Sequence, residues 1–280
     1  MIKVNLVADM DCDRCGRPAV IFQPYSGLHL CTVHVRDDIF RKAKKTIRQH
    51  AWLRPGDRIA LACSEGSIGI ALLDFMKALV NGRKDVSIFA ILDGDDNNAD
   101  AFSGISGADA LNIGGIRAQQ KNPLHLVAET EGPFAKKHET ENFLSCAAKE
   151  NHANVLAMSY PLEYHAEWAL WKAVNGEMPG LLKKRPINGR QFRIIRPFMH
   201  IPAIELDICA RMVLEKYNLD DGLFIPEHRE STMITRMLEE FGCRHPGSRF
   251  ALVNIWEDIS RVVRQSECRT PPERGHSHGP

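Results

Sequence analysis

The fold is decided by residues 59–92, which begin with IALAC (59–63), SEGSIG (64–69) and IALLDFMKALV (70–80) and end with VSIFAIL (86–92). The first and last of these runs are short and apolar, as buried strands are, whereas residues 70–80 have the length and apolar spacing of a helix. A strand, a helix and a second strand in this order predict a βαβ unit with parallel strands.

Three further apolar runs continue this pattern: LHLVAE (124–129), NVLAMSY (154–160) and FRIIRPF (192–198). The segments between them are long enough to hold crossover helices. Strands that alternate with helices predict an α/β fold, a parallel and doubly wound sheet with helices on both faces. We assign this fold to residues 56–260, and we expect a small zinc finger at 1–35, a basic linker helix at 36–55 and a disordered tail at 261–280.

The composition is that of an ordinary globular protein. The chain has 280 residues, of which 44% are hydrophobic and 25% are charged, and this excludes a fibrous, collagenous or wholly disordered chain. No apolar run approaches the roughly 18 residues that a membrane-spanning helix needs. The N-terminus turns acidic at DMDCD (9–13), where a secretory signal would stay apolar. We therefore expect a cytoplasmic protein with no membrane partner.

Two pairs of potential metal ligands lie near the N-terminus. Cys12 and Cys15 are separated by two residues, and so are Cys31 and His34. Such a gap lets both side chains of a turn face one ion, and four ligands complete the tetrahedral shell of zinc without leaving an open position. We therefore predict a structural zinc that stabilises a module too small to bury a core of its own.

The other cysteines in the body of the chain stand alone in apolar or helical surroundings, where a free thiol acts as a small buried hydrophobe. They are Cys63, Cys146, Cys209 and Cys243. An alternative makes Cys63 a nucleophile, because it lies at a strand end ahead of a helix N-terminus, which lowers a thiol pKa. Core packing is favoured, since no neighbouring histidine marks a base for it.

A basic amphipathic helix is predicted at residues 36–50. Ile39, Ala43 and Ile47 share one face of this helix. The remaining face carries cations at Arg41, Lys42, Lys44, Lys45 and Arg48. These cations either form a solvated surface or contact the phosphate backbone of an RNA.

The loop after the first strand carries the main chemical signal. A helix N-terminus behind a parallel strand presents free N–H groups to phosphate oxygens, and Ser64, Gly66 and Ser67 are small enough to allow that approach. Glu65 opposes it with a negative charge, and no lysine follows as in a Walker loop. If the chain is an ATP-dependent enzyme, Asp93 or Asp95 at the end of the next strand would hold magnesium or orient ATP; the alternative is a solvated acidic loop.

The order of these features resembles the tRNA 2-thiolation proteins of the PP-loop, adenine nucleotide α-hydrolase-like family. The resemblance rests on the two ligand pairs, the basic helix, RPGDRIALACSEGS (54–67) and RIIRPFMHIPAIELDICA (193–210). In the second stretch, Arg196, Pro197, Phe198 and the later Glu205 look like the family's arginine-x-x-proline-leucine motif with its following glutamate. The resemblance implies a zinc finger, a nucleotide-binding sheet, ATP with magnesium, and a tRNA base that is adenylated before sulfur replaces its oxygen.

The departures from this family fall on its catalytic motifs. The family's Ser-Gly-Gly-Lys-Asp-Ser loop is replaced by SEGSIG (64–69), and its Gly-His-Asn-x-Asp-Asp-Glu turn by SYPLEYH (159–165), which keeps an acidic residue only at Glu163. The stretch EGPFAKKHETENFLSC (131–146) lacks the Cys-x-x-Cys pair with which many members hold an iron–sulfur cluster or carry sulfur. Without three thiolates a cluster has too few ligands, so we predict none.

Two hypotheses of different class follow. In the first, the chain is a pseudoenzyme or regulator that binds tRNA and possibly a nucleotide, acts with a protein partner or as a homodimer, and has impaired or lost thiolation activity. In the second, it is an active ATP-dependent tRNA-modifying enzyme that transfers sulfur with a divergent loop. Neither hypothesis assigns a catalytic residue.

Overall fold

A computed structural model of the chain describes residues 10–63, 66–92, 110–112, 134–176, 192–217 and 232–267. Its strands are β1 (Ile21–Gln23), β2 (Leu28–Leu30), β3 (Arg58–Ala62), β4 (Ser87–Leu92), β5 (Ala110–Asn112), β6 (Val155–Ala157) and β7 (Arg193–Ile195). Its helices are α1 (Thr32–Gln49), α2 (Gly66–Val80), α5 (Ala135–Glu150), α6 (Leu162–Val174), α8 (Ala203–Lys216), α9 (Met233–Arg244) and α10 (Ser248–Glu267).

The main sheet has the strand order β5-β4-β3-β6-β7, and every neighbouring pair is parallel. This confirms the predicted α/β fold. The strands expected at 59–63, 86–92, 154–160 and 192–198 correspond to β3, β4, β6 and β7. The strand expected at 124–129 lies outside the described residues, and the three residues of β5 are too few to give a recognisable pattern in the sequence.

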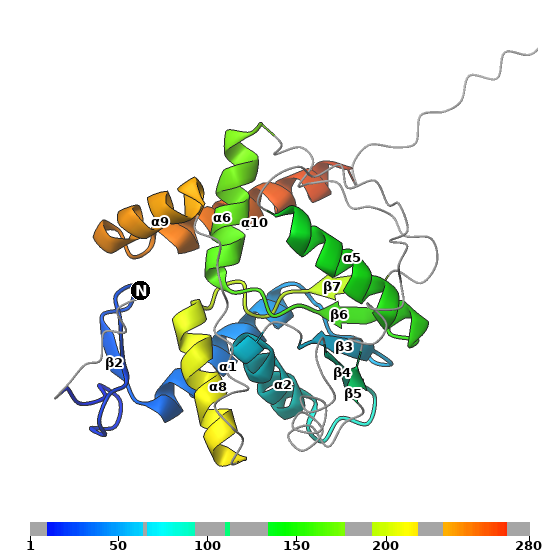
Figure 1. Cartoon of the computed structure of the whole chain (residues 1–280), viewed down its shortest axis with the longest axis horizontal. Helices are drawn as coiled ribbons and strands as arrows, with labels where there is room; N and C mark the ends of the chain where they lie inside the picture. The colour runs from blue at the N-terminus through cyan, green and yellow to red at the C-terminus, as the bar shows by residue number, and fades with distance from the viewer. Residues whose placement is uncertain are drawn as a thin grey trace, which may run out of the picture.

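Helices cover both faces of this sheet, as Figure 1 shows. The side chains of the central strand β3 alternate between the two faces. Ile59 and Leu61 pack in one cluster with residues of α1, α2 and α8, whereas Ala60 and Ala62 pack in a second cluster with residues of α5. The sheet is therefore doubly wound, and its central strands are buried on both sides.

A third apolar cluster joins α6 to the C-terminal helices α9 and α10, through residues that include Leu162, Leu238 and Val253. The tail predicted from residue 261 starts inside α10, because the prolines that suggested disorder begin only at Pro271. Residues 268–280 lie outside the described residues. None of the described helices is long and apolar enough to cross a membrane.

The N-terminal module consists of the antiparallel strands β1 and β2 and leads directly into α1. The apolar stripe predicted for this helix is buried, with Ile39 and Ala43 fully inaccessible and Ile47 at 5% exposure. The stripe packs in the cluster that contains β3, so the helix attaches the small module to the main domain.

Candidate metal centre, basic surface and sheet edge

The four predicted metal ligands come together in the N-terminal module. Cys12 and Cys15 lie in a tight turn in which the N–H groups of Cys15 and Gly16 donate to the carbonyl of Cys12 at 3.1 and 2.9 Å. Gly16 has φ +68°, a conformation that side chains disfavour. Cys31 is the N-cap residue of α1, and His34 lies in the first turn of this helix.

The distances between these side chains fit a single tetrahedral ion. The ligand atoms all lie within 4.8 Å of one another. The Sγ atoms of Cys15 and Cys31 are 3.7 Å apart, and His34 Nδ1 is 3.3 Å from the Sγ of Cys12 and 3.5 Å from that of Cys31. Metal–sulfur bonds of about 2.3 Å in a tetrahedron place two sulfurs about 3.8 Å apart. The donor set therefore fits a bound metal ion.

The surroundings of Cys12 and Cys15 favour the thiolate form that binds metals. Burial acts against the charge of Cys12, but hydrogen bonds from the backbone of Cys31 and Arg14 outweigh it and lower the pKa of Cys12 to about 6. Arg17 donates from Nε to the Sγ of Cys15 at 3.3 Å, which lowers the pKa of this second thiol.

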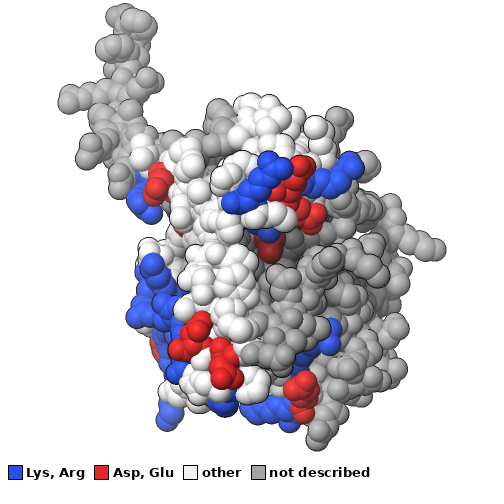
Figure 2. Space-filling model, turned by 90° about the vertical axis from the view of Figure 1, so that its left-hand side faces the viewer, with Lys and Arg blue, Asp and Glu red and all other residues white. Residues whose placement is uncertain are grey.

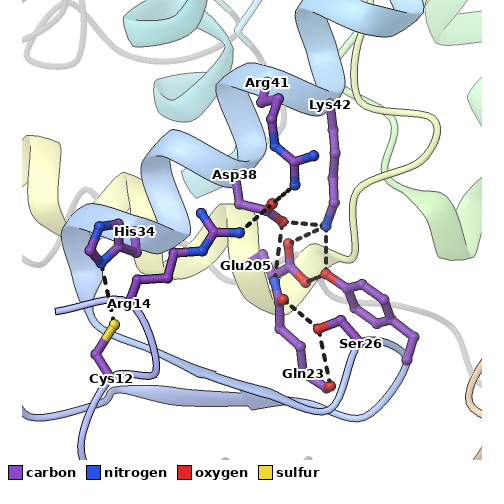
Figure 3. Close-up of polar contacts among 10 residues, drawn as sticks. Cys12, Arg14, Gln23, Ser26, His34, Asp38, Arg41, Lys42 and Glu205 are labelled. Atoms are coloured by element: carbon purple, nitrogen blue, oxygen red, sulfur yellow. Dashed lines mark hydrogen bonds and ion pairs between the residues drawn. The ribbon is translucent and has the colours of Figure 1, made fainter. Parts of the chain in front are cut away.

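A cluster of ion pairs attaches the module to α1 and α8, and Figure 3 shows its side chains pointing toward one another. Its centre is the carboxylate of Asp38 in α1, which contacts Lys42 at 2.6 Å, Arg14 at 3.5 Å and also Arg41. Gln23 of β1 donates to the same carboxylate at 3.4 Å. Burial disfavours the charge of Asp38, but these contacts hold its pKa below the usual range. We call this group the Asp38 cluster.

Glu205 in the first turn of α8 extends the Asp38 cluster. Lys42 Nζ lies 3.4 Å from Glu205, and Tyr25, in the turn between β1 and β2, donates to the same carboxylate. Burial raises the pKa of Glu205, although Lys42 opposes this shift. Glu205 was singled out in sequence by its motif, and in the structure it binds the N-terminal module, which is 180 residues away from it in the chain.

The five cations predicted to contact RNA differ in their surroundings. Lys42 is held between the carboxylates of Asp38 and Glu205, and its side chain is 19% exposed. Arg41 also contacts Asp38, but its side chain is 67% exposed. Lys45 and Arg48 are exposed, and Lys44 lies over the ring of Phe40. Lys and Arg side chains gather along one side of the face that carries the module (Figure 2).

The nucleotide-binding crevice of such a sheet lies where the strand order reverses, outside the carboxyl ends of the strands. Here the chain proceeds from β3 to β4 on one side and returns to β6 on the other, so this point lies between β3 and β6. Gly66 is the first residue of α2, so the helix begins four residues earlier than the predicted start at residue 70 and includes part of the predicted loop. Ser67 is fully buried and donates from Oγ to Asp207 of α8 at 2.6 Å. The other two residues predicted to bind the nucleotide, Ser64 and Asp93, lie outside the described residues.

The carboxyl edge of β6 and β7 is lined by aromatic and charged side chains. Tyr160 and Tyr164 stack with ring centres 4.1 Å apart, and Lys137 Nζ lies 5.3 and 4.9 Å from these ring centres. Arg196 donates from one terminal nitrogen, Nη2, to both carboxylate oxygens of Glu141 at 2.8 and 2.9 Å. Lys137 and Glu141 were missed in the sequence, because nothing in α5 marks them as neighbours of this edge.

Glu163, the acidic residue kept in the divergent turn, has a structural contact. Its Oε2 accepts a hydrogen bond from the backbone N–H of Ala203 at 2.9 Å. This N–H belongs to the first residue of α8, where helical partners are lacking. Glu163 therefore caps α8 and links it to the first turn of α6.

Comparisons with known proteins agree with this architecture. Residues 11–34 match the family model for the N-terminal LIM domain of the 2-thiouridine synthetase TtuA. The tRNA-5-methyluridine(54) 2-sulfurtransferase of Thermus thermophilus is 36% identical over 70 residues, which are 25% of this chain and 22% of that protein. The tRNA 2-thiolation protein NcsA of Haloferax volcanii is 22% identical over 295 residues, which cover 91% of this chain and 88% of that protein.

Among solved structures, the U34-tRNA thiolase NcsA from Methanococcus maripaludis has the same fold. The two structures superpose with a TM-score of 0.69 at 18% identity, and the match covers 91% of this chain and 88% of that one. Together with the family model and the two sequence relatives, this confirms the resemblance to tRNA 2-thiolation proteins.

The same comparison corrects one prediction about cofactors. The solved thiolase contains a [4Fe-4S] cluster, so the prediction that such a cluster is excluded was wrong. That prediction considered only the stretch at 131–146, where a Cys-x-x-Cys pair is missing. Thiolate ligands are gathered by the fold, and the described residues bring three of them together at Cys12, Cys15 and Cys31.

Proposed function

We propose that this chain, which is related to the tRNA 2-thiolation proteins, binds tRNA through its N-terminal module and α1, and that its thiolation activity is impaired or lost. The relatedness rests on the family model, the sequence relatives and the shared fold. The tRNA ligand, the metal and the state of the nucleotide site are parts of the proposal.

The observation that carries the tRNA-binding proposal is the arrangement of cations beside the metal ligands. Lys44, Lys45 and Arg48 contact no carboxylate among the described residues, and α1 holds them on the same rigid element as His34. The Asp38 cluster fixes this helix to the module and to α8. A fixed row of uncompensated cations favours the phosphate backbone of a nucleic acid.

The nucleotide part of the proposal rests on the loop between β3 and α2. The residues SEGSIG (64–69) contain no lysine, and Glu65 adds a negative charge where phosphates would lie. The hydroxyl of Ser67 is already bound to Asp207. Backbone N–H groups of the α2 N-terminus alone would have to hold the phosphates, so we propose that ATP binds weakly or not at all.

For the metal, we propose that Cys12, Cys15, Cys31 and His34 hold one zinc ion. The distances between the ligand atoms support a mononuclear tetrahedral site. A bound ion would stabilise the module and fix the start of α1. Metal analysis of the purified protein for zinc, iron and inorganic sulfide separates this proposal from an iron–sulfur cluster.

The binding test compares tRNA affinity of the unmodified protein with that of a triple variant, Lys44→Glu, Lys45→Glu and Arg48→Glu. Lys42 is left unchanged, because its loss would disturb the Asp38 cluster. The triple variant should lose most of its affinity while keeping its metal content and thermal stability. Arg261→Glu on α10, where the side chain is 62% exposed, is the control and should bind like the unmodified protein. No tRNA affinity at low salt in the unmodified protein would refute the proposal.

The second candidate function is an active ATP-dependent tRNA-modifying enzyme, and the cluster in the solved thiolase favours it. Calorimetry with ATP and magnesium distinguishes the two, because an active enzyme needs micromolar binding. The substitution Glu65→Gly should tighten ATP binding if the charge of Glu65 is the obstacle. Sulfur incorporation into tRNA after anaerobic reconstitution with iron and sulfide would establish the second function directly.

A further inference from the structure

A cavity lies where the N-terminal module meets α6, α8 and the corner between α9 and α10. Its volume is about 170 Å³, and its walls come from residues as far apart in the chain as Ile21 and Phe250. Ligand sites form preferentially between domains, and those that hold drug-sized molecules enclose about 300–1,000 Å³. This cavity therefore has room for a single ring system but not for a large cofactor.

The walls of the cavity are largely apolar and include three aromatic rings. Phe22 and Tyr25 come from the module, and Phe250 comes from α10. The ring centres of Tyr25 and Phe250 are 4.7 Å apart, and the hydroxyl of Tyr25 donates to Glu205, which fixes the ring in place. All three aromatic side chains are half-buried, so they can still contact a ligand. Such walls favour a flat ring that stacks on them, as unpaired RNA bases do.

Two carboxylates also line the cavity. Glu163 accepts a hydrogen bond from the backbone N–H of Ala203, and Glu205 is held by Tyr25 and Lys42. An ionised carboxylate has about four acceptor sites and donates no hydrogen bond. These side chains therefore favour a ligand whose edge carries N–H donors.

Arg249, in the first turn of α10, is the cation of the cavity. Its Nε atom is buried and has no hydrogen-bond partner, and no carboxylate contacts its guanidinium group among the described residues. A buried donor without a partner costs free energy, and a guanidinium group binds phosphate oxygens well. The cavity thus combines stacking surfaces and acceptors with one cation that lacks an anion.

We propose that this cavity binds one unstacked nucleotide of the RNA, with the base inside and its phosphate at Arg249. The proposal rests on the proposed tRNA binding by the module and α1, because the module supplies two of the aromatic walls. Since Glu163 and Glu205 offer acceptors, the preferred base carries an amino group, as adenine, cytosine and guanine do and uracil does not. A simple organic acid would satisfy Arg249 but would bring a further negative charge to the two glutamates.

Short single-stranded RNAs test the base preference. The probes are hexauridine and the same hexamer in which one central uridine is replaced by adenosine, cytidine or guanosine, and fluorescence anisotropy at low salt measures their affinity for the full chain. Each replaced hexamer should bind at least about fivefold more tightly than hexauridine, because the amino group gains an acceptor. Equal affinities for all four hexamers would overturn the proposal.

A substitution at Gly242 blocks the cavity without removing a side chain from it. Gly242 lines the cavity, and a Cβ atom there meets nothing within 4 Å, so leucine should occupy part of the space without displacing a neighbour. Gly242→Leu should weaken binding of the adenosine hexamer about tenfold and abolish its preference over hexauridine. Gly247→Leu is the matched control, because Gly247 is equally open but does not line the cavity. Its affinities should equal those of the unmodified protein.

The salt dependence of binding separates the base contact from the phosphate contact. Each phosphate contact on a single strand contributes about 0.7 to the slope of log affinity against log salt, so Arg249→Gln should lower the slope by that amount. Gly242→Leu should weaken binding at every salt concentration and leave the slope unchanged. An unchanged slope in Arg249→Gln would overturn the assignment of the phosphate to this side chain.

The outcomes distinguish this inference from the proposed function. If the unmodified protein binds neither tRNA nor the hexamers, both fail together. If tRNA binding depends on Lys44, Lys45 and Arg48 but Gly242→Leu binds the hexamers as tightly as Gly247→Leu, the inference alone is overturned. Circular dichroism should show both leucine variants to be folded, so that a loss of affinity reports on the cavity.

Discussion

Replacing Gly69 by alanine should destabilise the protein, although alanine is the better helix former. A Cβ atom at Gly69 would lie 2.8 Å from the Cα, 2.9 Å from the carbonyl oxygen and 3.0 Å from the carbonyl carbon of Cys63. Gly69 lies in the first turn of α2, and Cys63 directly follows β3. The missing side chain therefore allows the helix to pack closely against the end of the central strand.

Two opposing contributions determine how much the free energy of unfolding changes. Inserting a methyl group into a packed site costs about 1–3 kcal/mol, and the upper part of this range applies because the obstructing atoms are backbone atoms of a central strand. Alanine stabilises a helix by about 1 kcal/mol relative to glycine, and this partly offsets the cost. The net loss of unfolding free energy should therefore be about 1–2 kcal/mol.

Gly242→Ala is the matched control, because Gly242 also lies in a helix but a Cβ there meets nothing within 4 Å. Only the difference in helix propensity remains, so the free energy of unfolding of this variant should rise by about 0.5–1 kcal/mol. Urea unfolding followed by circular dichroism measures both changes. The reasoning is refuted if the two midpoints move in the same direction, or if Gly69→Ala unfolds no earlier than the unmodified protein.

Three other perturbations have expected outcomes. Removing the metal with a chelator should increase hydrogen exchange in residues 10–36 while the sheet stays protected, because the ligands close the module; loosening of the whole chain at once would contradict this. Lys42→Met should cost about 3 kcal/mol by leaving buried Asp38 and Glu205 without a shared partner, whereas exposed Lys45→Met should change stability by less than about 0.5 kcal/mol. Equal urea midpoints for these two variants would show that Lys42 is not a structural residue. Glu257 contacts His50 at 2.7 Å and His200 at 3.1 Å, and despite burial these contacts lower its pKa from 4.5 to about 2. After a reduction for solvent screening, the ionised Glu257 side chain should contribute about 2 kcal/mol to the free energy of unfolding. Because its pKa is lowered in the folded state, this contribution is present above pH 4.5 and is lost as the pH falls toward 2. The difference between the unmodified protein and Glu257→Gln should shrink over that interval, and a constant difference would argue against the assignment.

The parts of the protein that the sequence predicted are those with local signals. The four residues of the candidate metal site were grouped because two-residue gaps place paired side chains on one turn, and the fold brings both pairs together. The strands β3, β4 and β6 were identified because interior parallel strands are continuous apolar runs, and the edge strand β7 was identified from its own short apolar run. The buried stripe of α1 followed from its helical spacing in the same way.

The parts that it did not predict depend on partners that are distant in the chain. Ser67 was expected to face a phosphate, but its hydroxyl binds Asp207, which is 140 residues away. Gly69 was interpreted as part of a phosphate loop, yet its backbone lies against Cys63, and only packing shows this. Charge patterns along one helix, likewise, do not show which cations a distant carboxylate will bind.

The Asp38 cluster changes how many phosphates α1 can contact. The sequence offers five cations, but Lys42 lies between two carboxylates and Arg41 contacts one of them. Lys44, Lys45 and Arg48 remain without a carboxylate among the described contacts. Each phosphate contact contributes about 0.9 to the slope of log affinity against log salt on a duplex, so this helix accounts for a slope of about 2.7. The triple glutamate variant should reduce the measured slope by about that amount, as titrations of tRNA at several salt concentrations would test. If adding Arg41→Glu to the triple variant reduces the slope by about a further 0.9, Arg41 leaves Asp38 when RNA binds, and the rigid attachment of α1 to the N-terminal module would then have to be abandoned.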